Sequence, residues 1–426
     1  MPRTRCIRSY LPRRRGAALY VVVLGVTLIV AVLGLAALSE LHLQREASGR
    51  AHDMQNAHHY AQAAVEIGMQ RMADDANWRD TYSNGVWESQ QAIGDGTYTI
   101  EGIDPEDGVL NDSDADSLVL TGTGVKGTAV QKIEVTLTPD PHGFACLEVA
   151  LLVGNTLNVN STAGVTGNVT VASNNVIDGN NNVTFSPDSE VVTAYTEPVS
   201  PGTMTTGALS RNTPTWNDAI DYYQTNGTTI SITSLPLVGG IRTIEDVVLS
   251  AANNPYGANV TNGEGIYVID CQSQDIRIRN CRIVATLLLL NAGASSEVSG
   301  SVNWSAAVTN YPILLVNSIA FNFSNADLAE SSTSFNPPGT PYGGNADTDV
   351  ADVYPSVMQG LVYVSTNATT NNHPAFDGVV VVGNTMDITS DLDLAYQSTY
   401  LDDPPPGFSD YSGFKVSIGS WRQDVD

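Results

Sequence analysis

Basic side chains are scarce in this sequence of 426 residues. Lysine and arginine together number 19, against 45 aspartates and glutamates, which gives a formal net charge of -26. Six of the arginines lie in residues 1–16, a segment without acids, so the remainder is more acidic still. Because such a body repels phosphate backbones, we expect no nucleic-acid partner.

Cysteine and histidine are also rare, with four and six residues. No pair of cysteines has the spacing of a zinc site. Cys271 and Cys281 lie ten residues apart on either side of a strand-like run, so they are a candidate disulfide in an oxidising compartment. Past residue 72 the histidines are His142 and His373, and no G-x-S-x-G, Walker or dinucleotide motif occurs. We therefore do not expect an enzyme.

A long apolar run lies near the start of the chain. Residues 17–38 carry no charge, and as a helix they span roughly 33 Å, enough to cross a hydrocarbon core of about 30 Å. The arginines precede this run, which predicts a cytoplasmic N-terminus in the bacterial inner membrane and a periplasmic or extracellular C-terminal part. A secretory signal peptide cleaved near Ser39 is the alternative.

The helical pattern continues past the apolar run to about Met72. Small and apolar residues recur there at spacings of three and four, and no proline interrupts them. We expect one transmembrane and stalk helix over residues 17–72, about 80 Å long.

The N-terminal residues resemble those of type IV pilins and pseudopilins. The sequence around Gly16 and Ala17, RGAAL, followed by the apolar run, looks like a prepilin-peptidase site, and residues 38–68 are similar to PilX-type minor pilins. The resemblance implies cleavage after Gly16, methylation of Ala17 and other pilin or pseudopilin subunits as partners of the helix. Most pilins have glutamate at the fifth mature position. Val21 stands there, as in tip pseudopilins, which argues against a repeating major subunit.

The periodicity changes to that of strands after the stalk. Runs at 98–103, 117–123 and 128–137 predict a small antiparallel sheet within residues 96–140. The loop before the second run holds Asp112, Asp114 and Asp116, whose alternating carboxylates are a candidate calcium site. A solvated acidic turn is the alternative.

Residues 150–426 are rich in Asn, Thr, Val and Gly, and they contain an internal repeat. The segment 152–161, LVGNTLNVNS, matches 381–390, VVGNTMDITS, almost position by position. Short strands, Asn/Gly turns and inward aliphatics favour a parallel β-helix, with a β-sandwich as the alternative. We expect insertions at 186–262 and 325–356, and a short helix at 213–225 capped by Thr213.

The fold class expected is therefore α+β: a long helix, a small antiparallel sheet and an all-β domain. The expected function is a non-enzymatic minor pilin-like envelope protein for pilus or secretion-fibre assembly or surface adhesion, with surface glycans as candidate ligands. Two alternatives remain: an adhesin unrelated to pili, and a carbohydrate-active β-helix enzyme. For the enzyme, Arg277 and Arg279 beside Asp275 could form a lyase-like corner, although a solvated strand face explains them as well.

Overall fold

The chain folds into two compact units, comprising residues 1–140 with 412–426 and residues 141–411. The computed structural model describes residues 15–75, 77–160, 163–167, 169–179, 184–196, 200–324, 326–411 and 413–424. The expected α+β class is confirmed, because a long helix, an antiparallel sheet and a parallel β domain follow one another along the chain.

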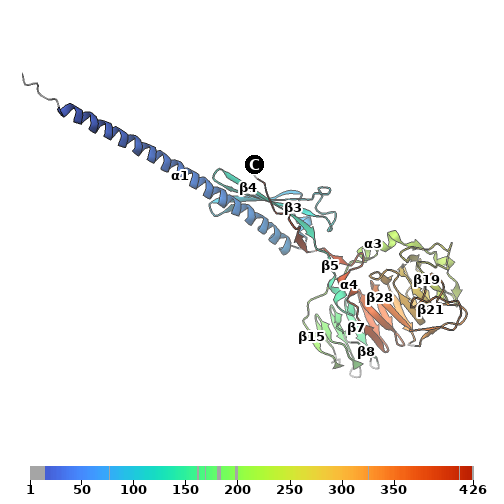
Figure 1. Cartoon of the computed structure of the whole chain (residues 1–426). Helices are drawn as coiled ribbons and strands as arrows, with labels where there is room; N and C mark the ends of the chain where they lie inside the picture. The colour runs from blue at the N-terminus through green and yellow to red at the C-terminus, as the bar shows by residue number, and fades with distance from the viewer. Residues whose placement is uncertain are drawn as a thin grey trace, which may run out of the picture. The chain divides into compact units, whose positions relative to one another are not determined.

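The first unit is built on helix α1 (Arg15–Asp74), which Figure 1 shows as one unbroken rod. Its bounds lie within two residues of the predicted range. The apolar side chains between Leu19 and Leu43 are exposed, while Ala57, Ala61 and Ala64 are fully buried. The same helix therefore has an uncovered apolar part and a part that belongs to a core.

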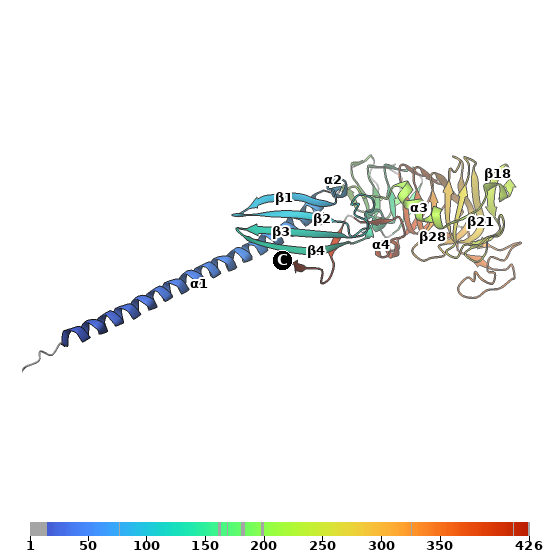
Figure 2. The ribbon, with the colours of Figure 1, turned by 90° about the horizontal axis from the view of Figure 1, so that it is seen from above.

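An antiparallel sheet packs on the second part of α1, and Figure 2 shows its strands side by side along the helix. Its order is β1-β2-β3-β4-β34, and β35 also pairs with β4. The strands are β1 (Gly85–Ile93), β2 (Gly96–Ile103), β3 (Leu118–Lys126), β4 (Ala129–Pro139), β34 (Phe414–Val416) and β35 (Arg422–Asp424). A short helix, α2 (Trp78–Thr81), joins α1 to β1. The sequence predicted β2, β3 and β4, but not β1 or the two strands from the C-terminal segment.

Alanine on the helix and glycine on β3 allow a close approach of the two backbones. A Cβ on Gly122 would lie 2.1 Å from the Ala61 carbonyl oxygen, and one on Gly124 would lie 2.0 Å from that of Ala57. The alanine-rich stretch that predicted a stalk is therefore also the face that receives the sheet.

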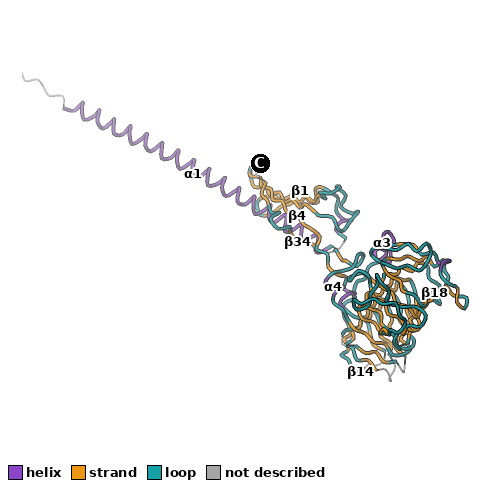
Figure 3. The backbone as a smooth tube through the Cα atoms, turned by 45° about the vertical axis from the view of Figure 1, so that its right-hand side comes forward, coloured by secondary structure: helices purple, strands orange, loops and turns teal. Residues whose placement is uncertain are grey.

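The second unit is a parallel β-solenoid, seen in Figure 3 as stacked strands. From β6 to β15 each strand pairs with the third strand after it, whereas from β20 to β25 the strands are longer and each pairs with the second strand after it. Parallel pairing decides between the two expected architectures in favour of the β-helix. The first limb consists of β6 (Leu151–Val153), β7 (Thr156–Val159), β8 (Gly164–Thr166), β9 (Val171–Ser173), β10 (Val176–Asp178), β11 (Thr184–Phe185), β12 (Ser189–Val191), β13 (Ala194–Tyr195), β14 (Ser200–Pro201) and β15 (Met204–Thr206). Strands β12 to β15, which lie within the insertion expected at 186–262, therefore belong to the solenoid.

The chain then crosses to a second limb through helix α3 (Trp216–Asn226). The strands of this limb are β16 (Thr228–Thr229), β17 (Leu237–Val238), β18 (Ile241–Glu245), β19 (Val248–Ser250), β20 (Ile266–Asp270), β21 (Ile276–Val284), β22 (Thr286–Leu290), β23 (Glu297–Ser305), β24 (Pro312–Val316), β25 (Ile319–Phe323), β28 (Val357–Val364), β29 (Ala368–Thr370), β30 (Ala375–Val382), β31 (Met386–Ile388) and β32 (Leu392–Ala395). Residues 326–356, the described part of the insertion expected at 325–356, leave the solenoid between β25 and β28. It contains the small pair β26 (Leu328–Ala329) and β27 (Val353–Tyr354).

The two limbs meet at a seam between segments that are far apart in sequence. β30, β31 and β32 pair in parallel with β6, β7 and β8, with Val381 opposite Leu152 and Met386 opposite Leu157. The two copies of the internal repeat are therefore neighbouring turns, stacked directly on each other.

A ladder of side-chain hydrogen bonds crosses this seam at one corner of the solenoid. Thr193 donates to Asn175 (2.9 Å), Asn175 to Asn155 (2.8 Å), and Asn155 to Asn384 (3.3 Å). Asn384 in turn donates to Asn367 (2.9 Å). Asn175, Asn155 and Asn384 each both donate and accept along the stack, which explains why asparagine recurs at these turns.

Two apolar cores lie on opposite sides of one solenoid face. The interior is filled by aliphatic and aromatic side chains such as Trp304 and Phe321. On the outside of the face formed by β6, β22, β24 and β28, a second core is covered by α3, the 3-10 turn Ala145–Glu148 and α4 (Thr399–Asp402). Thr215, rather than the expected Thr213, caps α3, because its hydroxyl accepts the Asp218 amide (3.3 Å).

The segments flanking the solenoid also pair with each other. β5 (His142–Gly143) forms an antiparallel bridge with β33 (Ser409–Asp410). The 3-10 turn Ile232–Ser234 lies at the start of the second limb.

The seam predicts a sharp effect of side-chain size at Gly154. A Cβ there would lie 2.2 Å from the Gly383 carbonyl oxygen, so Gly154→Val must push neighbouring turns apart. We expect a loss of about 2 kcal/mol in the free energy of unfolding of the second unit. Faster hydrogen exchange in 151–153 and 379–382, measured by mass spectrometry, would report it. Gly263→Val is the matched control, since nothing lies within 4 Å of a Cβ at Gly263; equal exchange in the two variants would contradict the prediction.

Candidate functional site

Helix α1 is the one helix among the described residues that is long and apolar enough to cross a membrane. Leu19 is 68% exposed and Val21 is 72% exposed, and the exposed apolar residues continue to Leu43. The backbone at the expected processing site, Gly16 and Ala17, lies within the helix. An apolar surface of this length needs lipid or other apolar helices to cover it.

The acidic loop between β2 and β3 is held in shape by a buried arginine on α2. Arg79 is 7% exposed, and its guanidinium donates to the carbonyl oxygens of Leu110 (2.9 Å) and Asp116 (2.5 Å). The Arg79 Cζ atom lies over the ring of Trp78, 4.7 Å from the ring centroid. Leu110 is itself buried in the core of the first unit, so both limbs of the loop are anchored.

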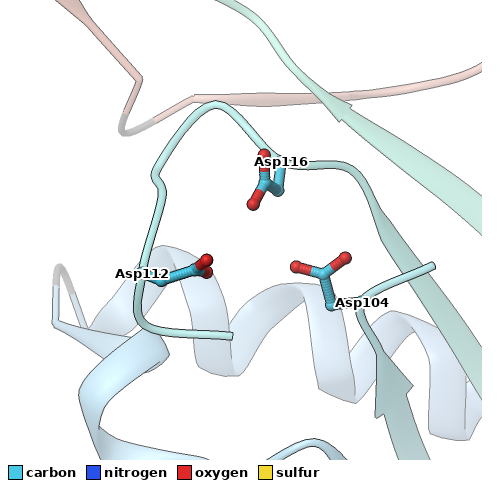
Figure 4. Close-up of side chains that lie close together, drawn as sticks. All are labelled: Asp104, Asp112 and Asp116. Carbon is cyan, nitrogen blue, oxygen red and sulfur yellow. The ribbon is translucent and has the colours of Figure 1, made fainter. Parts of the chain in front are cut away.

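The structure brings together a set of carboxylates that differs by one residue from the expected set. Asp104, Asp112 and Asp116 each place an oxygen within 4.8 Å of the others, and Figure 4 shows the three side chains pointing toward one another. Asp114 is not a member, because its carboxylate turns to the Arg79 guanidinium (3.8 Å) and is 81% exposed. Sequence reasoning missed Asp104, which lies at the end of β2, before the alternating run.

The three carboxylates differ in burial. Asp104 is 3% exposed; its backbone N–H donates to Asn84 (2.7 Å), and its Oδ1 accepts the Glu106 N–H (2.7 Å). Asp112 lies at the exposed rim. Loss of hydration within the loop, a hydrogen bond shared with Asp107, and the charges of Asp107 and Asp116 raise the pKa of the Asp112 carboxyl. Carboxylate oxygens that converge in this way can share protons or bind a hard cation.

The three cysteines among the described residues are buried inside the second unit and are not bonded to one another. Cys271 and Cys281 are both free, so the expected disulfide is wrong. Cys271 follows β20 and Cys281 lies in the second half of β21, which places them on different faces of one solenoid turn. Burial raises the pKa of the Cys271 and Cys146 thiols to about 12, and it raises that of Cys281 as well.

The arginines considered for a lyase-like corner are engaged in contacts between solenoid turns. Arg277 pairs with Glu297 (2.5 Å), and Arg279 pairs with Glu245. The two arginines do share the outward face of β21, as predicted. Arg282, on the second half of that strand, is buried and donates to the carbonyl oxygens of Phe335 and Thr340 (2.7 Å each). It therefore fastens the 326–356 insertion to the solenoid.

Taken by its fold, the chain is an α+β protein with an N-terminal apolar helix, an antiparallel sheet packed on that helix, and a parallel β-solenoid. No protein-family model and no curated protein matches it. Among solved structures, the competence-associated pilin ComZ from Thermus thermophilus is 11% identical; the match covers 88% of this chain and 98% of that chain, with a TM-score of 0.35. An ice-binding protein from an Antarctic Biological Consortium is 12% identical, over 60% of this chain and 91% of that chain, with a TM-score of 0.23. Both likenesses are too distant to bear on function.

The buried thiols predict a distinct pattern of alkylation. In the folded protein at pH 8 we expect no reaction of iodoacetamide with Cys146, Cys271 and Cys281 within minutes, because the raised pKa values and burial remove the thiolate. In denaturant without reductant, all three should take one label each, counted by mass spectrometry. If Cys271 and Cys281 were labelled only after reduction, the free-thiol assignment would be wrong.

Proposed function

We propose that this chain is a minor pilin-like subunit of the bacterial cell envelope, cleaved after Gly16 by a prepilin peptidase. In this proposal α1 anchors the mature chain once in the inner membrane and later packs against other pilin or pseudopilin subunits. The solenoid is displayed in the periplasm or outside the cell, where it supports fibre assembly, secretion or adhesion.

The observation that carries the proposal is the division of α1 into two parts. Its first part is apolar and exposed, and its second part is the core helix of an antiparallel sheet. A subunit that moves from a bilayer into a fibre needs this arrangement, because lipid and neighbouring helices both favour a long apolar surface while the head stays folded in water. The residues around Gly16, which resemble a prepilin-peptidase site, support the same role.

Val21 favours a terminal rather than a repeating position in such a fibre. Pilins in general have glutamate at that position, which pairs with the amine of a neighbouring subunit. Val21 is 72% exposed and offers no such charge. A subunit that lacks this glutamate–amine pair is suited to the tip of a fibre, where no further subunit is added beyond it.

The outward faces of the solenoid favour binding over catalysis. The arginines of β21 are paired with glutamates, and the ladder from Thr193 to Asn367 presents amides and hydroxyls at regular turns. Repeated donors and acceptors of this kind suit the hydroxyl groups of surface glycans. We therefore propose adhesion without an enzymatic activity as the role of this unit.

The mature N-terminus tests the processing step. Intact-mass and N-terminal peptide analysis of the protein from its membrane fraction should show a chain that begins at Ala17 with a methylated amine. In a host without prepilin peptidase the same chain should retain the six arginines of residues 1–16. A start at Met1 in the presence of the peptidase, or a start near Ser39, would contradict the proposal.

Charges placed in the apolar run test the anchor. Leu28→Arg/Val32→Arg puts two guanidinium groups near the middle of the charge-free run 17–38, at a cost of about 3 kcal/mol each. We expect the double variant to lose membrane retention after a carbonate wash, as seen by immunoblotting of the pellet. Ala47→Arg, on the exposed helix beyond the run, is the control and should stay in the pellet. Equal retention of all three proteins would argue against a membrane-spanning α1.

A further inference from the structure

Three carboxylates converge in the loop between β2 and β3 without a positive partner. One oxygen each from Asp104, Asp112 and Asp116 lies within 4.8 Å of the others, and the side chains face a common point (Figure 4). Among the described residues, none of the three has an ion pair with a basic side chain. Three negative charges at this spacing repel one another strongly unless something neutralises them.

Asp104 provides a second and independent observation. Its side chain is 3% exposed, and its Oδ1 accepts the Glu106 N–H. Its Oδ2 is buried and has no hydrogen-bond partner among the described residues, although it belongs to the carboxylate that faces the cluster. A buried carboxylate oxygen without a donor is unfavourable, and a bound cation would satisfy it.

The nearest arginine shapes this cluster without neutralising it. The Arg79 guanidinium directs two donors to the carbonyl oxygens of Leu110 and Asp116, and its Nε faces Asp114. The loop is therefore curved by contacts to its backbone, while Asp114 alone receives the positive charge. The negative charges of Asp104, Asp112 and Asp116 are therefore not compensated by Arg79.

We propose that Asp104, Asp112 and Asp116 form a binding site for a single hard divalent cation, with calcium as the preferred ion. A point equidistant from three atoms 4.8 Å apart lies about 2.8 Å from each, close to the 2.3–2.6 Å of calcium–oxygen bonds. Small side-chain rotations close the difference. Magnesium requires near-ideal octahedral geometry at about 2.0–2.1 Å, which is a poorer match to ligands spread over a long loop. Water would complete the coordination on the exposed side, where Asp112 lies.

The consequence of binding would be structural. Asp104 lies at the end of β2, whereas Asp112 and Asp116 lie on the return toward β3, so one ion would tie the two limbs of the loop together. The cation and Arg79 would then act on opposite sides of the same segment, one through carboxylates and the other through carbonyl oxygens. This inference does not depend on the proposed pilin function.

Calorimetric titration of the full chain in detergent tests the site. After treatment with a chelator and buffer exchange, calcium chloride should bind saturably with one ion per chain, and magnesium chloride should compete weakly. Asp112→Asn and Asp104→Asn should each raise the Kd at least tenfold. Asp114→Asn is the matched control: it removes an equal charge from the same loop, and its Kd should change less than twofold.

Because Asp112 is exposed, we expect the Asp112→Asn variant to fold. If Asp104→Asn disturbs the core, as seen by circular dichroism, the comparison of Asp112→Asn with Asp114→Asn decides. Calcium should also slow hydrogen exchange in residues 104–117 of the wild type and of Asp114→Asn, but not of Asp112→Asn. No saturable binding to the wild type at millimolar calcium, or equal losses in Asp112→Asn and Asp114→Asn, would overturn the proposal.

Discussion

The solenoid depends on one set of parallel hydrogen bonds, those that join β30, β31 and β32 to β6, β7 and β8. These strands are separated by more than two hundred residues of chain, yet they are adjacent turns of one structure. The first limb grows away from the seam on one side, and the second limb returns to it on the other. Without the seam there would be two separate stacks, each with an open parallel edge and only part of the interior core.

The seam also explains where the remaining apolar surface goes. The chain must cross from the end of one limb to the far end of the other, and α3 makes this crossing along an outer face of the stack. That face is lined by aliphatic side chains on both sides of its strands, including Leu152, Leu288 and Val381, whereas the outward positions of β21 carry arginines. The crossing segment thus covers a second core, and the uncovered faces remain polar.

Much of this architecture could be predicted from the sequence, because it rests on periodic patterns. The charge-free run predicted the exposed part of α1, and the match between 152–161 and 381–390 pointed to stacked turns. β1 was missed because it carries few apolar residues and is interrupted by bulges near Glu88 and Gln90. β34 and β35 were missed because their partner, β4, is nearly three hundred residues away.

The candidate site shows a similar limit. Alternation selected Asp112, Asp114 and Asp116, but spacing cannot reveal that Arg79 attracts Asp114 or that Asp104 is buried at the strand end. The cysteine pair failed for a related reason, since ten residues of separation say nothing about which solenoid face each thiol occupies. In both cases the deciding contact is tertiary and leaves no local signal.

The order in which the chain supplies these strands has a consequence for folding during synthesis. Synthesis from the N-terminus delivers β6 to β15 first, long before the strands that complete their neighbouring turn. During that interval β6 has an unpaired parallel edge, of the kind that invites misassociation with other emerging chains. Turns can stack within each limb as they are made, but the seam closes only when β32 has been delivered, so completion of the solenoid marks the arrival of nearly the whole polypeptide.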